Sequence, residues 1–358
     1  MIALLVGAAL ALAPVPADTV VDTVFVASNR RRTARGFSRV VSDSLWYGVY
    51  VTRTSSSSGA ARALSAMRVT RIDSTALDPA QWRARLRTAA RDTSAGGAAL
   101  VFVHGYSSSP GEAVAQGVQV KERGGHRGPL ILFLWPTHEL YVAPPTPARA
   151  YKDDARAAAQ SGGALARVVR AVDSLAVSTV LVAHSMGSRV ALDASITDVA
   201  TYTQLAAHPL RAFGIFSPDI GAERFRDAFA PRLPTVARRI AIYGSSNDYL
   251  LGAAVMINGE RRASGITRRG TPLAGIELVD ATRGARAEPV LLALLGPRHA
   301  VRWASAALAD FFRVVVAGAD PSCRVSVGAA DAEGEGRWRL RRGSIPSQVP
   351  GADCISQP

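Results

Sequence analysis

The stretch TVLVAHSMGSRVALDA, residues 179–194, contains the signal that decides the fold of this 358-residue chain. A run of apolar, largely β-branched residues leads directly into AHSMG (183–187), and a helical pattern rich in alanine and valine follows. A strand, a turn with serine at its apex and a helix are the setting of a nucleophile elbow, where the strained backbone requires small residues two positions before and after the serine. Ala183 stands where glycine is usual. We interpret Ser185 as a nucleophile, and an ordinary turn serine is the alternative.

Similar apolar runs recur on both sides of this stretch. They are short and largely unalternated, which is the pattern of strands buried on both faces of a parallel sheet. We predict such strands at 98–105, 129–136, 177–187, 212–219, 238–248 and 275–282. We also predict two earlier strands, 23–28 and 45–53, on either side of a polar, arginine-rich turn. A serine-rich loop at 55–60 and then two short helices are predicted after them.

Amphipathic helical patterns occupy residues 148–175 and 300–317, although Gly162 and Gly163 weaken the middle of the first. The alternation of strands and helices predicts an α/β fold with a mostly parallel, doubly wound sheet flanked by helices. Ligands of such sheets bind beyond the carboxyl ends of the strands. We therefore expect the chemically active residues at that edge.

The expected oxyanion hole consists of two backbone N–H groups. One is that of Met186, at the start of the helix that follows Ser185, where the helix dipole also favours negative charge. The other is that of Tyr106, in the loop after the predicted strand 98–105. His104 and His184, which stand in the same two motifs, are interpreted as structural residues.

A serine hydroxyl needs a general base, and the base is expected to be a histidine that follows the acid in the chain. The sequence has six histidines, of which only His208 and His299 follow Ser185. His208 precedes every acid at a strand end and lies in a connection between a helix and a strand. His299 follows the last predicted strand, so we select it by elimination; a surface or capping histidine is the alternative.

Three aspartates end predicted strands between the nucleophile and His299. Asp248 closes the strand before the last one, which is the commonest position of the acid, and is our first choice. Asp219, one strand earlier, is the alternative acid. Asp280 is expected to make a structural hydrogen bond.

With these residues assembled, the sequence resembles the α/β-hydrolase superfamily, and more narrowly a bacterial family of uncharacterised α/β hydrolases. The resemblance rests on VFVHGY (101–106), FLWP (133–136), AHSMGSR (183–189), SPDI (217–220) and SSND (245–248), and it covers about residues 22–316. It implies an acyl hydrolase fold with a serine, aspartate and histidine triad, and it leaves the substrate open. Trp135 and Pro136 either line an acyl pocket or cap the sheet, and Tyr151 and Asp154 are interpreted as structural.

The combination predicts a serine hydrolase that cleaves carboxylic esters, from small molecules or lipids, through an acyl-enzyme on Ser185. Esterase, lipase, thioesterase and acyltransferase share this chemistry and stay undistinguished. A catalytically silent α/β-hydrolase fold that serves as a binding or interaction module is the alternative, because a fold does not establish a function.

The two ends of the chain are predicted to differ from the central domain, 18–317. The apolar run 2–13 and the following small residues resemble a secretory signal peptide, 1–17, which implies a secreted or periplasmic protein. An N-terminal anchor or a buried first strand is the alternative. Residues 318–358 are interpreted as an appended tail, in which Cys323 and Cys354 either form one disulfide or stay as thiols.

The composition excludes several classes of protein. Hydrophobic residues make up 48% and charged residues 20%, which excludes a disordered chain. The formal net charge is +14, but 40 of the 42 basic residues are scattered arginines without a nucleic-acid-binding motif, so no nucleic-acid partner is expected. Contact with a membrane surface stays open. No metal-ligand cluster, phosphate loop or dinucleotide fingerprint occurs, so no metal and no cofactor are expected.

Overall fold

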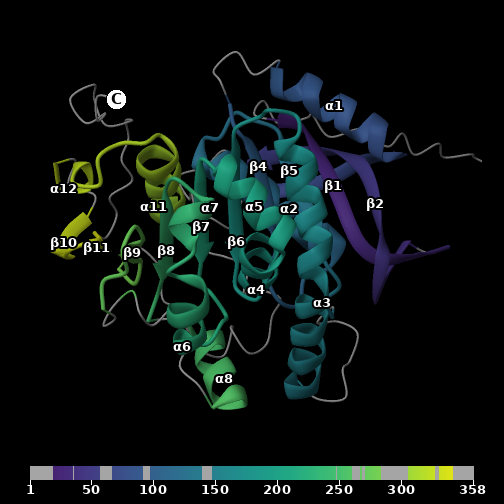
Figure 1. The fold of residues 1–358 in the computed structure, drawn as a ribbon. Coiled ribbons are helices and arrows are strands. Elements are labelled where there is room, and N and C mark those ends of the chain that lie inside the picture. Colours follow the sequence, from purple (N-terminus) through teal and green to yellow (C-terminus); the bar gives the residue numbers. More distant parts are fainter. Residues whose placement is uncertain are drawn as a thin grey trace, which may run out of the picture.

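The apolar runs of the sequence form the central strands of a single sheet in the computed structural model (Figure 1). The structure describes residues 19–34, 36–56, 67–91, 97–138, 147–246, 248–259, 267, 271–283, 305–326 and 330–341. The predicted signal peptide, His299 and Cys354 lie outside these residues.

The described strands are β1 (Thr19–Thr33), β2 (Gly36–Ser56), β3 (Met67–Leu77), β4 (Ala99–Val103), β5 (Leu130–Leu134), β6 (Thr179–His184), β7 (Ala212–Phe216), β8 (Ile240–Gly244), β9 (Glu277–Asp280), β10 (Ala330–Gly334) and β11 (Arg337–Leu340). Their order across the sheet is β10-β11-β9-β8-β7-β6-β4-β5-β1-β2-β3. Neighbours from β11 to β1 run parallel, and antiparallel pairs stand at both margins. The predicted α/β fold with a mostly parallel sheet is confirmed.

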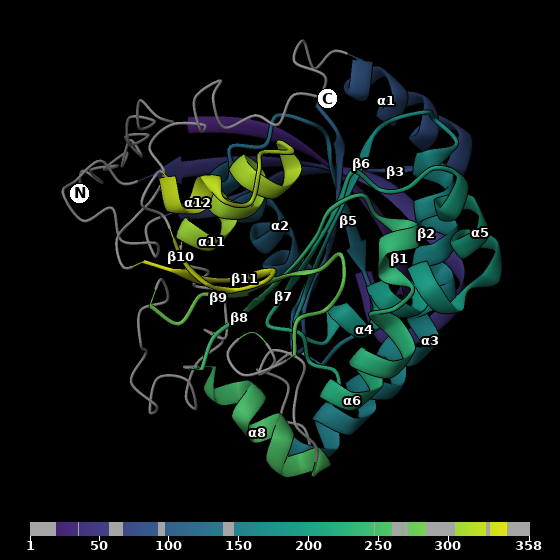
Figure 2. The same ribbon diagram turned by 60° about the vertical axis from the view of Figure 1, so that its left-hand side comes forward.

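Helices cover both faces of this sheet (Figure 2). One face packs against α1 (Pro79–Arg91), α3 (Pro147–Asp173), α4 (Gly187–Leu192) and α5 (Val199–Ala207), and the other against α2 (Pro110–Gly124) and α11 (Ser305–Asp310). Short segments complete the described helices: η1 (Asp193–Thr197), α6 (Ala222–Arg224), η2 (Phe225–Phe229), α7 (Leu233–Val236), α8 (Tyr249–Asn258), η4 (Phe311–Val316) and α12 (Cys323–Ser326). Successive strand residues alternate between the two cores: Val101 and Val103 enter one, and Leu100 and Phe102 the other.

The N-terminal region differs from the prediction in two respects. The turn expected between the first two strands is mostly strand, because β1 and β2 keep pairing until Thr33 opposes Gly36. The guanidinium of Arg32 covers the rings of Phe37 and Trp46 at 5.6 and 5.4 Å from their centroids, which stabilises this extension. In addition, one of the two short helices expected after residue 60 is the strand β3, which pairs with β2 along its length.

The helix predicted at 148–175 forms as α3 and continues through Gly162 and Gly163. A Cβ atom on Gly162 would lie 2.9 Å from the Cβ of Asp193, so this glycine permits the close approach of η1 and does not interrupt the helix. The described part of the helix predicted at 300–317 is α11 followed by the π-helical segment η4.

The C-terminal segment that the sequence predicted as an appended tail contributes two strands to the sheet. β11 pairs parallel with β9, and β10 pairs antiparallel with β11. Arg324, Cys323 and Trp338 are buried. The folded domain therefore extends beyond residue 317 to at least residue 340.

Within the described ranges, no helix has both the length and the apolar character needed to cross a bilayer.

Candidate active site

Ser185 occupies a sharp turn between β6 and α4. Its φ is +51°, in the left-handed region that costs a residue with a side chain about 1–2 kcal/mol. Its backbone N–H donates to the carbonyl oxygen of Phe216 on β7 at 2.9 Å, and its own carbonyl oxygen accepts from the Ser188 N–H at 3.0 Å. Strained backbone of this kind persists where the surroundings enforce it, and it concentrates at functional sites.

Two glycines allow the loop after β4 to lie directly against this turn. A Cβ atom on Gly105 would lie 3.0 Å from the Cβ of Ser185 and 2.7 Å from Nδ1 of His184. A Cβ atom on Gly187 would lie 2.3 Å from the carbonyl oxygen of His104, a separation that real Cβ atoms do not adopt. The glycine after the serine is therefore required by the neighbouring strand end, as the elbow pattern predicts.

Backbone hydrogen bonds align the carboxyl ends of the following strands with Ser185. The Ser217 N–H donates to the carbonyl oxygen of Tyr243 at 2.7 Å, and the Ala281 N–H donates to that of Gly244 at 2.8 Å. These bonds continue the ladder across β7, β8 and β9. The segments that carry Asp219, Asp248 and Asp280 therefore leave the sheet at the same edge as the elbow.

The two expected oxyanion donors lie on the two segments that meet at Gly105. Neither the Tyr106 N–H nor the Met186 N–H donates to another residue within the described part of the chain. Met186 is buried and stands directly before α4, and Tyr106 is half-buried. Burial raises the pKa of the Tyr106 phenol to about 12, with the Asp154 carboxylate as the smaller cause, so the phenol stays neutral at ordinary pH.

The two candidate acids have different surroundings. The carboxylate of Asp219 is buried, lies 2.7 and 2.9 Å from the Tyr151 hydroxyl and accepts from Nη2 of Arg189 at 3.3 Å. Asp248 is half-buried and caps α8, where its carboxylate accepts from the Leu251 N–H at 3.1 Å. Asp280 accepts from the Thr282 N–H at 2.9 Å, which is the structural role expected for it.

His104 directly follows β4 and is fully buried. Its ring stacks on Trp135 with centroids 5.3 Å apart, and Nε1 of Trp135 donates to the His104 carbonyl oxygen at 2.7 Å. Trp135 is fully buried in this packing. Burial, with a smaller contribution from the Arg30 charge, lowers the pKa of His104 to about 3. His104 is therefore neutral at ordinary pH and has no accessible ring for proton transfer, as its structural interpretation requires.

His104, which is buried, and His126, which is half-buried, should make the fold sensitive to acid. Burial also lowers the pKa of His126 to about 4, from an ordinary value of 6.5. Below pH 6.5 these histidines are protonated in the unfolded chain but stay neutral in the folded chain. The free energy of unfolding therefore decreases by up to about 1.4 kcal/mol for each histidine and each unit by which the pH is lowered. Urea unfolding measured from pH 7 to 4.5 should show this decrease in the free energy of unfolding, and His126→Gln should make the dependence on pH less steep. A variant with the slope of the wild type would contradict the assignment.

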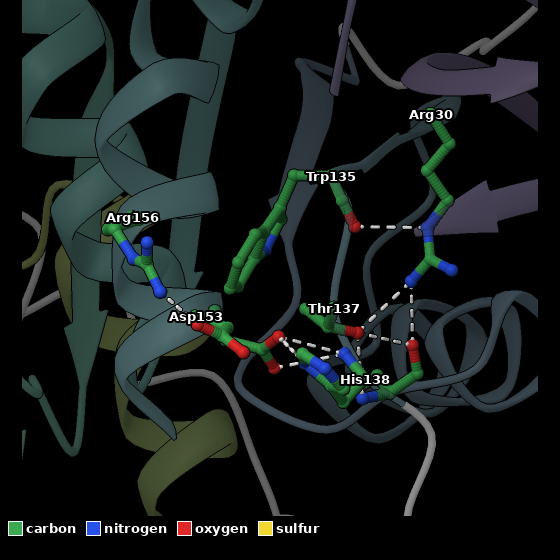
Figure 3. A network of polar contacts seen from close by, with 8 residues as sticks. Arg30, Trp135, Thr137, His138, Asp153 and Arg156 are labelled. Atoms are coloured by element: carbon green, nitrogen blue, oxygen red, sulfur yellow. Dashed lines mark hydrogen bonds and ion pairs between the residues drawn. The ribbon is translucent and has the colours of Figure 1, made fainter. Parts of the chain in front are cut away.

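From the sequence, Tyr151 and Asp154 are interpreted as structural, and His138 and Arg189 have no predicted role. The structure brings all four to the edge where Ser185 lies. Asp154 is buried and accepts from the His138 backbone N–H at 2.9 and 3.0 Å and from its ring Nδ1 at 2.5 Å. Figure 3 shows His138 next to Thr137, which joins Arg30 in a hydrogen-bond network. No pattern in the sequence indicates these pairings, because 16 or more positions separate the partners.

Other features of the described residues do not form a second centre. No group of three or more His, Cys, Asp or Glu side chains among them could hold a metal ion. An open cavity of about 490 Å³ lies where β6, β7 and β8 begin, and another of about 500 Å³ lies where β8 and β9 begin; Arg238 lines both. These cavities are at the opposite edge of the sheet from Ser185.

The parallel sheet, the strained serine turn at its carboxyl edge and the glycine-lined loop beside it define an α/β hydrolase. The chain belongs to a family of α/β hydrolases of unknown function (DUF900), whose model matches residues 79–288. No curated protein and no solved structure matches the chain.

Proposed function

We propose that the protein is a serine hydrolase that cleaves carboxylic esters through an acyl-enzyme on Ser185. The observation that carries the proposal is the positive φ of this buried serine at a strand-to-helix turn, with Gly105 packed against it. A strained turn of this geometry presents the hydroxyl at the helix N-terminus, where developing negative charge is stabilised. A small-molecule ester or a lipid ester is the proposed substrate class.

The reaction begins when the Ser185 oxygen attacks the acyl carbon and a histidine accepts the hydroxyl proton. The carbonyl oxygen gains negative charge and is stabilised by the Tyr106 and Met186 N–H groups, an interaction worth a few kcal/mol in similar sites. The histidine returns the proton to the leaving alcohol as the acyl-enzyme forms. Water then attacks the ester of Ser185, the acid is released and the serine is regenerated.

His299 is the proposed base and Asp248 the proposed acid. The sheet order supports this pair, since Asp248 follows β8 and His299 lies after β9 in the chain. Asp219 is the weaker candidate, because both of its carboxylate oxygens already face the Tyr151 hydroxyl. An acid that orients the base needs a carboxylate oxygen available to the imidazole N–H.

Asparagine substitutions of the two acids should separate them. Asp248→Asn should lower kcat for p-nitrophenyl butyrate by about 10³–10⁴-fold, because the neutral amide no longer stabilises the imidazolium. Asp219→Asn should cost less activity, since its role is to hold Tyr151 and Arg189. His299→Ala should match the larger loss. If Asp219→Asn were the more damaging of the two, Asp219 would be the acid.

Absence of hydrolysis in the wild type across esters, thioesters and acyl-chain lengths would overturn the proposed activity. That result would favour the silent binding module, since the fold alone does not establish catalysis.

A further inference from the structure

Tyr151 and Asp154 lie in the first two turns of α3, three positions apart and therefore on the same face of the helix. Both side chains are at least nine-tenths buried, with 7% and 2% of their surface exposed. Each reaches a different loop at the carboxyl edge of the sheet. We refer to these two residues as the α3 bracket.

Asp154 holds the loop that carries one oxyanion donor. Its carboxylate accepts hydrogen bonds from both nitrogens of His138 described above. The hydroxyl of the adjacent Thr137 donates to the Ser108 carbonyl oxygen at 2.7 Å and accepts from the Ser108 N–H at 3.1 Å, so His138 and Thr137 connect Asp154 to the loop after β4. Ser107 directly follows Tyr106 and has a φ of +56°, so the backbone is strained one residue after the donor. Asp154 therefore holds that strained segment through His138 and Thr137.

Tyr151 holds the elbow, through two further residues. Its hydroxyl donates to the Asp219 carboxylate and accepts from Nη2 of Arg189 at 2.8 Å. The Asp219 N–H in turn donates to the carbonyl oxygen of Ser185 at 3.2 Å, and Nε of Arg189 donates to the Asp219 carbonyl oxygen at 2.6 Å. The turn that carries the Met186 N–H is thereby connected to the same helix.

Tyr151 also contacts the loop after β4 directly. The rings of Tyr106 and Tyr151 pack with their centroids 5.8 Å apart. The loop after β4 and the elbow are therefore both attached to one rigid helix, which runs for 27 residues. Since a displacement of about 1 Å of a catalytic group can cost about 10²-fold in rate, the separation of the two N–H groups has to be fixed closely.

We propose that Tyr151 and Asp154 are positioning residues, which set the separation of the two oxyanion donors by attaching both of their loops to α3. The inference rests on the proposed function, because it requires that the Tyr106 and Met186 N–H groups form an oxyanion hole beside Ser185. In this proposal α3 contributes to transition-state stabilisation by positioning the two donors, in addition to packing against the sheet.

The test compares Asp154→Asn with Asp153→Asn in the full chain. Asp153 is the matched control, because it is the adjacent residue and pairs with Arg156 (Figure 3), and 31% and 75% of the surfaces of these two side chains are exposed. Titration with a fluorophosphonate measures the concentration of competent sites, so kcat is expressed per site. The inhibition constant of a trifluoromethyl ketone, which forms a tetrahedral adduct, is measured beside KM for p-nitrophenyl butyrate.

Asp154→Asn should lower kcat about 10-fold or more and weaken the ketone by a similar factor, while KM changes less than about threefold. The single Asn oxygen accepts less well from the two His138 donors, so the two oxyanion N–H groups lose their relative position while substrate binding is retained. Asp153→Asn should behave as the wild type. Loss of folding would reduce the number of titrated sites without changing kcat per site or the ketone affinity.

Tyr151→Phe is the second variant, since it removes one hydroxyl and keeps the ring that packs on Tyr106. It should weaken the ketone relative to KM in the same direction. If the wild type is active but Asp154→Asn and Tyr151→Phe keep its kcat per site and ketone affinity, the bracket is refuted and the proposed function stands. If the wild type has no Ser185-dependent activity, both proposals fail.

Discussion

Ser185→Ala should lower ester hydrolysis by at least about 10⁴-fold, to the level of a reaction without acyl-enzyme formation. The proposed mechanism has a single nucleophile, and alanine removes the attacking oxygen while it leaves the two N–H donors in place. The measurement is the initial rate with p-nitrophenyl butyrate at saturating concentration. Ser174→Ala is the control, because that serine is exposed at the far end of α3 and should retain full activity.

The same position offers an independent check of the backbone geometry. Ser185→Gly should also be inactive, yet it should be more stable than Ser185→Ala by about 1 kcal/mol, because glycine adopts a positive φ without steric cost. Thermal unfolding of the two variants measures this difference. Activity in either variant would refute the assignment of Ser185 as the nucleophile. Equal stability of the two variants would refute only the backbone strain at this position.

Arg324→Met should destabilise the fold by about 3–5 kcal/mol, because it leaves the buried Asp310 carboxylate without its cation, whereas Glu277 keeps Arg239 at 2.9 Å. Arg324 is fully buried; its Nε and Nη2 donate to Asp310 at 2.8 and 3.1 Å, and its Nη1 donates to Glu277. The Tyr243 hydroxyl donates to the same Asp310 carboxylate at 2.7 Å. The cluster joins the C-terminal segment to β8, β9 and α11.

Urea unfolding followed by circular dichroism measures this loss. Arg341→Met is the control within the same segment, because its ion pair with Asp331 is exposed to solvent and its loss should leave the urea midpoint close to that of the wild type. Similar losses in the two variants would contradict the view that the C-terminal segment is part of the folded domain. A small loss in Arg324→Met would mean that the buried charges are hydrated.

The sequence was most informative where one strand or turn carries its own pattern. The apolar runs predict β4 to β9, and the AHSMG stretch predicts the turn at Ser185, because steric requirements act on adjacent residues. The length of the β1–β2 hairpin was not predictable, since Arg32 is stabilised by rings at positions 37 and 46. Gly162 weakens the helix prediction because glycine has a low helix propensity, and the sequence does not show that a glycine is needed there for the close approach of η1.

The polar residues around the site were less predictable than the strands. Tyr151 and Asp219 are 68 positions apart, and Asp154 and His138 are 16 apart, so only the tertiary fold pairs them. Asp219 and Asp248 each follow one of two neighbouring strands, β7 and β8. Their hydrogen-bond partners differ, since Asp219 pairs with the Tyr151 hydroxyl and Asp248 caps α8. The C-terminal strands were not predicted because they are short and rich in charge, and only Trp338 and Leu340 of β11 carry its buried face.

The proposed nucleophile is tested most directly by covalent labelling of the full chain with a fluorophosphonate, followed by mass spectrometry of the digested protein. The reagent should add one phosphonyl group to the peptide that contains Ser185, and Ser185→Ala should remain unlabelled. Wild-type protein that is folded but unlabelled, or labelling that maps to another residue and persists in Ser185→Ala, would contradict the account.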